Sequence, residues 1–180
     1  MADAIPAEPA TSRPIAAIIV GGVIVGVLDL TYAILVYSPR SPIRVPQAVA
    51  SGLLGAKSFS GGWETAALGV LLHFFIALSA ATVFYLASRR LRFLTQRPVL
   101  YGLIYGALVY SFMHLVVLPL SNVAHGPTRW AYQIPEFFWH WIGVGLPISL
   151  SVRRYAGEFR TMKCLWGANR ASTPGPAVHR

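Results

Sequence analysis

The sequence is poor in charge. Charged residues make up 12% of its 180 residues, whereas soluble domains carry roughly 25%. Hydrophobic residues make up 55%, and the mean hydropathy is +0.56. These values exclude an ordinary soluble domain and predict a single membrane-embedded domain.

Thiol groups are almost absent. The single cysteine, Cys164, lies in the polar C-terminal tail. One thiol forms no internal disulfide, no four-cysteine zinc site and no CxxC redox pair. A site built on paired cysteines is therefore excluded.

Acidic residues are scarce, because 6 Asp and Glu stand against 15 Lys and Arg, and the net charge is +9. Such an excess can indicate a nucleic-acid binder, but no recognition motif accompanies it. The basic residues lie instead between and beyond the apolar runs, which is the pattern of membrane topology. We therefore expect the lipid bilayer, and no nucleic acid, as a partner.

Four apolar segments are long enough to cross a bilayer, which takes about 20 helical residues. They are predicted at 15–37, 64–88, 98–119 and 135–152. Pro119 is expected to end the third segment and Pro135 to open the fourth. Residues 1–14 are expected to form a flexible lead, and residues 155–180 a basic tail that is disordered at its end. The predicted fold is an all-α bundle of four transmembrane helices.

A short extra helix is predicted between the first two spans. Residues 38–62 are bounded by Pro, Gly and Ser, and Pro46 suits the first turn of a helix that continues through QAVASGLL. About ten mildly apolar residues cannot cross a bilayer. The helix is therefore expected to lie in the interface or to form a re-entrant segment.

The distribution of charge predicts the orientation. Four spans place both termini and the loop 89–97 on one side, and that side carries most of the Lys and Arg residues. The positive-inside rule places this side in the cytoplasm. An aromatic belt is expected at the opposite boundary, formed by Trp63, Trp130, Tyr132, Trp139 and Trp141.

Polar residues inside the apolar segments are the main candidates for chemistry, because a charge within a bilayer costs a few kcal/mol or more. The candidate intramembrane polar site consists of Asp29, His73, Tyr110, His114, Glu136 and His140. The ionisable members lie on stripes of small residues, which mark the faces on which transmembrane helices pack. A rise of about 1.5 Å per residue places them in the outer half of the bilayer. We therefore expect a polar pocket near the outer face.

Several interpretations of this cluster stay open. The side chains can hydrogen-bond between helices and only fix the packing. Histidine and carboxylate groups can also sense or relay protons. A transition metal or a haem is a third possibility, with His73, His114, Glu136 and His140 as ligands, although no HxxxH, HExxH or CxxCH motif is present. An intramembrane enzyme is the least supported, because no nucleophile motif frames any serine.

The chain resembles the YagU-like family of bacterial inner-membrane proteins. The likeness lies in YSPRSP at 37–42, His73, FMHLVVLP at 112–119, EFFWH at 136–140 and the double arginine 153–154. The resemblance implies an inner-membrane location and places His73, His114, Glu136 and His140 on matching positions, whereas Asp29 has no clear counterpart. It implies no biochemical activity.

The sequence therefore favours a non-enzymatic, cofactor-free inner-membrane protein whose outer-half His/Glu cluster handles or senses protons. Such a protein can act as a homo-oligomer or as an accessory subunit of a membrane complex. The alternative is a metal- or haem-binding membrane protein with redox or hydrolytic chemistry.

Overall fold

The computed structural model describes residues 13–124 and 130–156, and the regular structure of these residues is entirely helical. Three helices are long and apolar enough to cross a membrane: Pro14–Tyr37, Gly62–Arg90 and Pro98–Leu120. The chain is thus a multi-pass helical membrane protein. Most of the predicted lead and of the predicted tail, with Cys164, lies outside the described residues.

The three helices extend the predicted spans at their ends. The first is α1 (Pro14–Tyr37) and the second is α3 (Gly62–Arg90). The third consists of α5 (Pro98–Phe112), η2 (Met113–Val117) and α6 (Leu118–Leu120). The loop before α5 contains one further turn of helix, α4 (Phe93–Gln96).

A last helical rod consists of α7 (Trp130–Trp139), η3 (His140–Gly145) and α8 (Leu146–Ala156), which follow one another without a break. The prediction that Pro135 opens this rod is wrong, because Pro135 lies inside α7. The ring of Tyr132 in the added turn lies 5.6 Å from that of Tyr37 in α1. This contact holds the start of α7 against α1, although the proline removes one backbone hydrogen bond.

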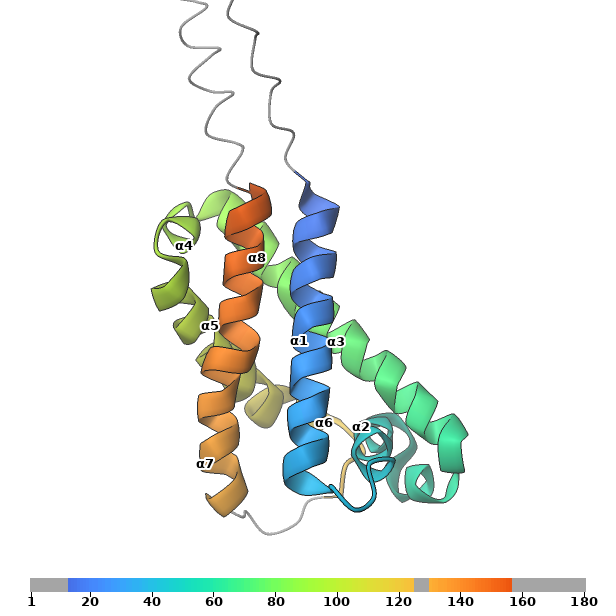
Figure 1. The fold of residues 1–180 in the computed structure, drawn as a ribbon. Helices are drawn as coiled ribbons and strands as arrows, with labels where there is room; N and C mark the ends of the chain where they lie inside the picture. The colour runs from blue at the N-terminus through green and yellow to red at the C-terminus, as the bar shows by residue number, and fades with distance from the viewer. Residues whose placement is uncertain (1–12, 125–129, 157–180) are drawn as a thin grey trace, which may run out of the picture.

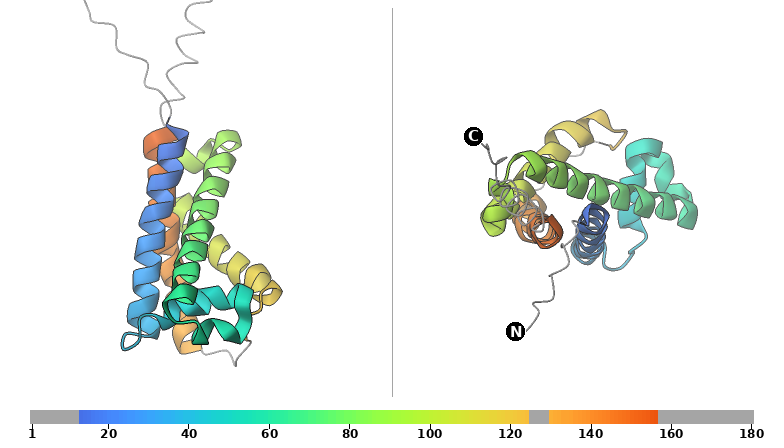
Figure 2. Two further views of the ribbon diagram at one scale, coloured as in Figure 1. Left: turned by 90° about the vertical axis from the view of Figure 1, so that its right-hand side faces the viewer. Right: turned by 90° about the horizontal axis from the view of Figure 1, so that it is seen from above.

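The rod and α1 lie side by side, and α3 crosses behind both of them at an oblique angle (Figure 1). Contacts join α1 to α3 and to α8, and join α5 to η3 and to α8. The view from above shows α5 on the far side of the rod from α1 (Figure 2). Pro14 and Ala156, the first residue of α1 and the last of α8, lie at the same end of the bundle (Figure 1).

Glycines bring these helices into backbone contact. A methyl group at Gly106 of α5 would overlap the carbonyl oxygen of His140, and one at Gly145 would overlap the carbonyl oxygen of Gly102. On the other side of the bundle, Gly26 of α1 receives the ring of Phe74. Small residues are typical of such close crossings in membranes.

A short helix follows α1, as the sequence predicts, but it begins at Arg44 rather than at Pro46. This helix, α2 (Arg44–Leu54), continues into the 3₁₀ turn η1 (Gly55–Ser60) and lies across the end of the bundle (Figure 2). It packs on α3, where Gly69 leaves room for the carbonyl group of Pro46. The chain beyond α6 is tied to it by the backbone N–H of Asn122, which donates to the carbonyl oxygen of Gly52 at 2.9 Å.

Two widened turns interrupt the long helices. Both η2 and η3 are π-helical, and each lies just before a proline, Pro119 or Pro147. A proline ring clashes with the carbonyl group four residues earlier. A wider turn is one way to accommodate that clash, and such turns are frequent at functional sites. The prediction that Pro119 ends the third helix is therefore wrong, because the helix continues through Pro119 to Leu120.

The apolar core occupies the half of the bundle that contains Pro14 and Ala156. Its most buried large side chains are Phe84 of α3 with Ile148 and Val152 of α8. In the other half, α3 and the α5–α6 helix diverge (Figure 2). The short helix α2 packs against α3 in this half, where Ala50 of α2 and Ala66 of α3 are buried.

Candidate functional site

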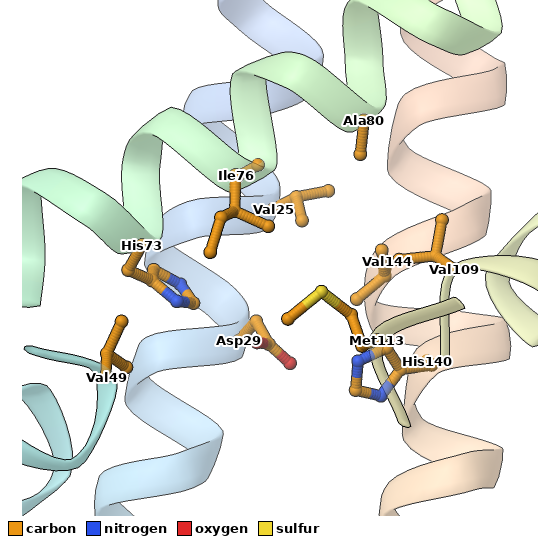
Figure 3. Close-up of a pocket in the computed structure, with 11 residues that line it drawn as sticks. Val25, Asp29, Val49, His73, Ile76, Ala80, Val109, Met113, His140 and Val144 are labelled. Carbon is orange, nitrogen blue, oxygen red and sulfur yellow. The ribbon is translucent and has the colours of Figure 1, made fainter. Parts of the chain in front are cut away.

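A pocket of about 110 Å³ lies where α1, α2, α3, α5, η2 and η3 meet. Three of its lining residues are ionisable: Asp29 of α1, His73 of α3 and His140 of η3. The Asp29 carboxylate lies between the two imidazole rings (Figure 3). The remaining walls are apolar, formed by Val25, Val49, Ile76, Ala77, Ala80, Val109, Met113 and Val144.

His140 is the most deeply buried of the three, with 8% of its surface exposed. Its Nδ1 atom lies 2.9 Å from the carbonyl oxygen of Glu136. A carbonyl oxygen only accepts, so Nδ1 carries the hydrogen and donates. The Nε2 atom of the neutral ring is then a free acceptor among the described residues.

His73 joins α3 to α1. Its Nε2 atom lies 3.0 Å from the carbonyl oxygen of Gly26 and must donate to it. The neutral ring therefore keeps Nδ1 as an acceptor without a hydrogen-bond partner in the described part of the chain. His73 donates through Nε2 and His140 donates through Nδ1 to a backbone carbonyl oxygen. Each neutral ring therefore keeps its other nitrogen as an acceptor with no partner in the described residues.

Asp29 is held from the last helical rod. The Nε1–H group of Trp139 donates to its Oδ1 atom at 3.0 Å. The Trp139 ring also stacks on Tyr32 of α1, with ring centres 4.3 Å apart and planes 5° from parallel. An ionised carboxylate can accept about four hydrogen bonds. Within the described residues this one receives a single bond, so most of its capacity is unused.

Tyr110 and His114 are outside the pocket. Their rings stack at 4.0 Å, and the His114 Nδ1 atom donates to the Tyr110 carbonyl oxygen at 3.1 Å. Tyr110 nevertheless reaches the site from behind, because its ring meets that of His140 edge-on at 5.3 Å. Met113, not His114, faces the cavity from η2.

Glu136 also lies apart from the pocket. Its Oε2 atom accepts a hydrogen bond from the hydroxyl of Tyr37 at 2.8 Å, at an exposed position between α7 and α1. The expectation that Glu136 joins the histidines is therefore wrong for its side chain. Only its backbone carbonyl contributes, through the bond from His140.

The described residues contain no group of three or more His, Cys, Asp and Glu side chains placed to hold a metal ion. Of the four predicted ligands, only His73 and His140 line the same cavity. The arrangement therefore differs from a preformed metal centre: it is a partly open, largely apolar cavity with hydrogen-bond acceptors on three of its lining residues.

Two residues of the site were not among the predicted ones. Trp139 was assigned to the outer aromatic belt, although its indole N–H is a donor from which the half-buried carboxylate of Asp29 can accept a hydrogen bond. Met113 was not predicted, because the four-residue spacing along the third segment selected the adjacent His114 instead. Of the other residues assigned to the belt, Trp63 is 78% exposed and Trp130 is 67% exposed.

The chain matches no protein-family model and no curated protein, and its fold matches no solved structure. The resemblance to the YagU-like family therefore stays a prediction from the motifs. The functional argument depends on the geometry of the pocket.

Proposed function

We propose that the protein is a four-span inner-membrane protein of bacteria, with both termini in the cytoplasm, whose pocket takes up a proton. The fourth span is the α7–η3–α8 rod, which runs antiparallel to α1 along its length (Figure 1). The excess of Lys and Arg on the side of the termini supports the orientation. In this orientation the pocket lies in the outer half of the bilayer, because Asp29 is closer to Tyr37 than to Pro14.

The observation that carries the proposal is the position of Asp29 between two imidazoles that each have a free nitrogen. A lone carboxylate inside a bilayer is costly when ionised. A proton on either ring supplies the opposite charge and makes the pocket neutral overall. Imidazole is the side chain that exchanges a proton between about pH 5 and 8.

Proton uptake has a structural consequence here. His73 is bonded to α1, and His140 belongs to the widened turn that packs on α5. When a ring gains a proton, its free nitrogen becomes a donor and is attracted to the Asp29 carboxylate. The proton therefore draws α1, α3 and η3 together. The proposed function is non-enzymatic pH sensing or proton handling. The structural change that follows protonation would be transmitted to a second copy of the chain or to a larger membrane complex.

The test is a titration of the full-length protein, labelled with ¹⁵N-histidine, in detergent or nanodiscs. We expect a ring titration step between about pH 5 and 8 that is lost in His140→Gln and altered in His73→Gln. His114→Gln is the matched control, because His114 is also in a π-helical turn but outside the pocket. Its step should be lost without changing those of the other two rings.

Two outcomes contradict the proposal. If both pocket variants fold with reduced thermal stability and show no lost step, the histidines only fix the packing. If the purified protein carries about one equivalent of transition metal, or a haem absorption band, that disappears in His73→Gln, the metal- or haem-binding alternative is correct.

A further inference from the structure

We infer that the same pocket binds a small primary ammonium ion with a short alkyl chain. The inference rests on the proposed function, because it assumes that this pocket is the functional site of the protein. It adds a ligand class that proton uptake alone does not require.

The polar groups of the pocket are acceptors only. The hydrogens on His73 Nε2 and His140 Nδ1 are both committed to backbone carbonyl oxygens. With neutral rings, the polar atoms of the lining side chains that have no hydrogen-bond partner in the described residues are acceptors: His73 Nδ1, His140 Nε2 and the second carboxylate oxygen of Asp29. An R–NH₃⁺ group has three donors and no acceptor, so it complements this set and neutralises the carboxylate.

The size of the pocket limits the ligand. A dry protein cavity of about 150 Å³ accommodates benzene. The present cavity of about 110 Å³ is smaller, so it suits a ligand of fewer heavy atoms, such as ethylammonium or propylammonium.

The walls suit the alkyl part of such a ligand. Val25, Ile76 and Val144 line the cavity on three different elements, and Met113 adds a flexible thioether side chain that adapts to irregular shapes. A bare ammonium ion or a hydrated sodium ion would leave these apolar walls without a partner. A neutral alcohol of the same size would meet the carboxylate without opposing its charge.

Binding should compete with protons. Of the elements that line the pocket, α1 contributes Asp29, α3 contributes His73 and η3 contributes His140, whereas the lining residues of α2, α5 and η2 are apolar. Tyr110 of α5 also faces the His140 ring, from outside the cavity. Protonation of either ring converts an acceptor into a donor and adds a positive charge. The affinity for an alkylammonium ion is therefore expected to fall as the pH is lowered from 8 to 5.5.

The experiment is a calorimetric titration of the full-length, detergent-purified protein at pH 8 with three probes: ethylammonium chloride, tetramethylammonium chloride and ethanol. Only ethylammonium combines N–H donors with a positive charge. We expect saturable binding of ethylammonium alone, with an affinity that falls at least about tenfold in Asp29→Asn because a charge-assisted hydrogen bond is lost. Asparagine still offers Trp139 an acceptor, and Val49→Phe, which fills the pocket from α2, is a second variant that should also abolish binding.

Equal responses to ethylammonium and tetramethylammonium, or no response to ethylammonium, would overturn the inference without any variant. Unchanged ethylammonium binding in a folded Asp29→Asn protein would do the same. The histidine titration of the unliganded protein is a separate measurement. A normal titration with no amine binding therefore rejects this inference alone, whereas amine binding with no histidine titration rejects only the proposed proton uptake.

Discussion

Gly106 provides a quantitative test of how the pocket is built. Its Cα hydrogen faces the backbone of η3, and a methyl group there would overlap the carbonyl oxygen of His140. Backbone atoms cannot rotate away as a side chain can, so α5 and η3 must separate. Overpacking of this kind costs about 1–3 kcal/mol, and we expect Gly106→Ala to lower the unfolding free energy by about 2 kcal/mol or more.

Gly52 of α2 is the matched control. A methyl group there meets only the Cβ atom of Ser121, at 3.7 Å, which is an ordinary contact. Replacing a helical glycine by alanine then stabilises by about 0.5–1 kcal/mol. The two Gly→Ala variants should therefore differ by about 3 kcal/mol, which is more than a hundredfold in the ratio of folded to unfolded protein.

The assay is unfolding by sodium dodecyl sulfate in mixed micelles, followed by tryptophan fluorescence. Gly106→Ala should also disturb the titration of His140, because it displaces the turn that carries this residue. Equal effects of the two substitutions on stability would refute the close approach of α5 and η3. A destabilised Gly106→Ala protein with an unchanged His140 titration would refute the link between this contact and the pocket.

Three further substitutions test single contacts. Trp139→Phe keeps a ring to stack on α1 but removes the N–H donor of Asp29, so it should destabilise by about 1–3 kcal/mol in the same unfolding assay; no change would mean that water replaces the indole. Gly69→Ala should push α2 away from α3, because the added methyl would overlap the carbonyl oxygen of Pro46, and faster proteolysis within α2 would report it. Tyr37→Phe removes an exposed hydrogen bond and should change stability by no more than about 0.5 kcal/mol, so a larger loss would show that this bond is shielded.

Much of the architecture could be predicted from the sequence because apolar length and proline position are strong signals. The three long helices and the short helix after α1 lie close to where the sequence places them. The misplaced boundaries are at prolines. Pro119 was expected to end the third helix, but the chain widens a turn before it and the helix ends at Leu120. Pro135 was expected to open the last rod, but the rod begins at Trp130.

The candidate site was predicted only in part, and the reason is the helical phase. Three residues that the small-residue stripes selected, Asp29, His73 and His140, line the pocket. The same counting followed a strict four-residue spacing from Gly102 to His114, which drifts about 120° around an α-helix of 3.6 residues per turn. Met113, at the ordinary helical spacing, stays on the face of Gly102 and lines the cavity. Glu136 bonds to Tyr37 at an exposed position and not to the pocket histidines. The sequence does not predict this contact, because the order of helices around a bundle cannot be read from one chain.

The most direct test of the account is whether Asp29 and the pocket histidines bind a proton as one unit. The measurement is the ¹⁵N ring titration of His140 in the unsubstituted protein, in Asp29→Asn and in His73→Gln. The account predicts that removal of the Asp29 carboxylate and removal of His73 each change the His140 titration, because the three groups share one cavity. A His140 titration that is identical in all three proteins would contradict the central claim.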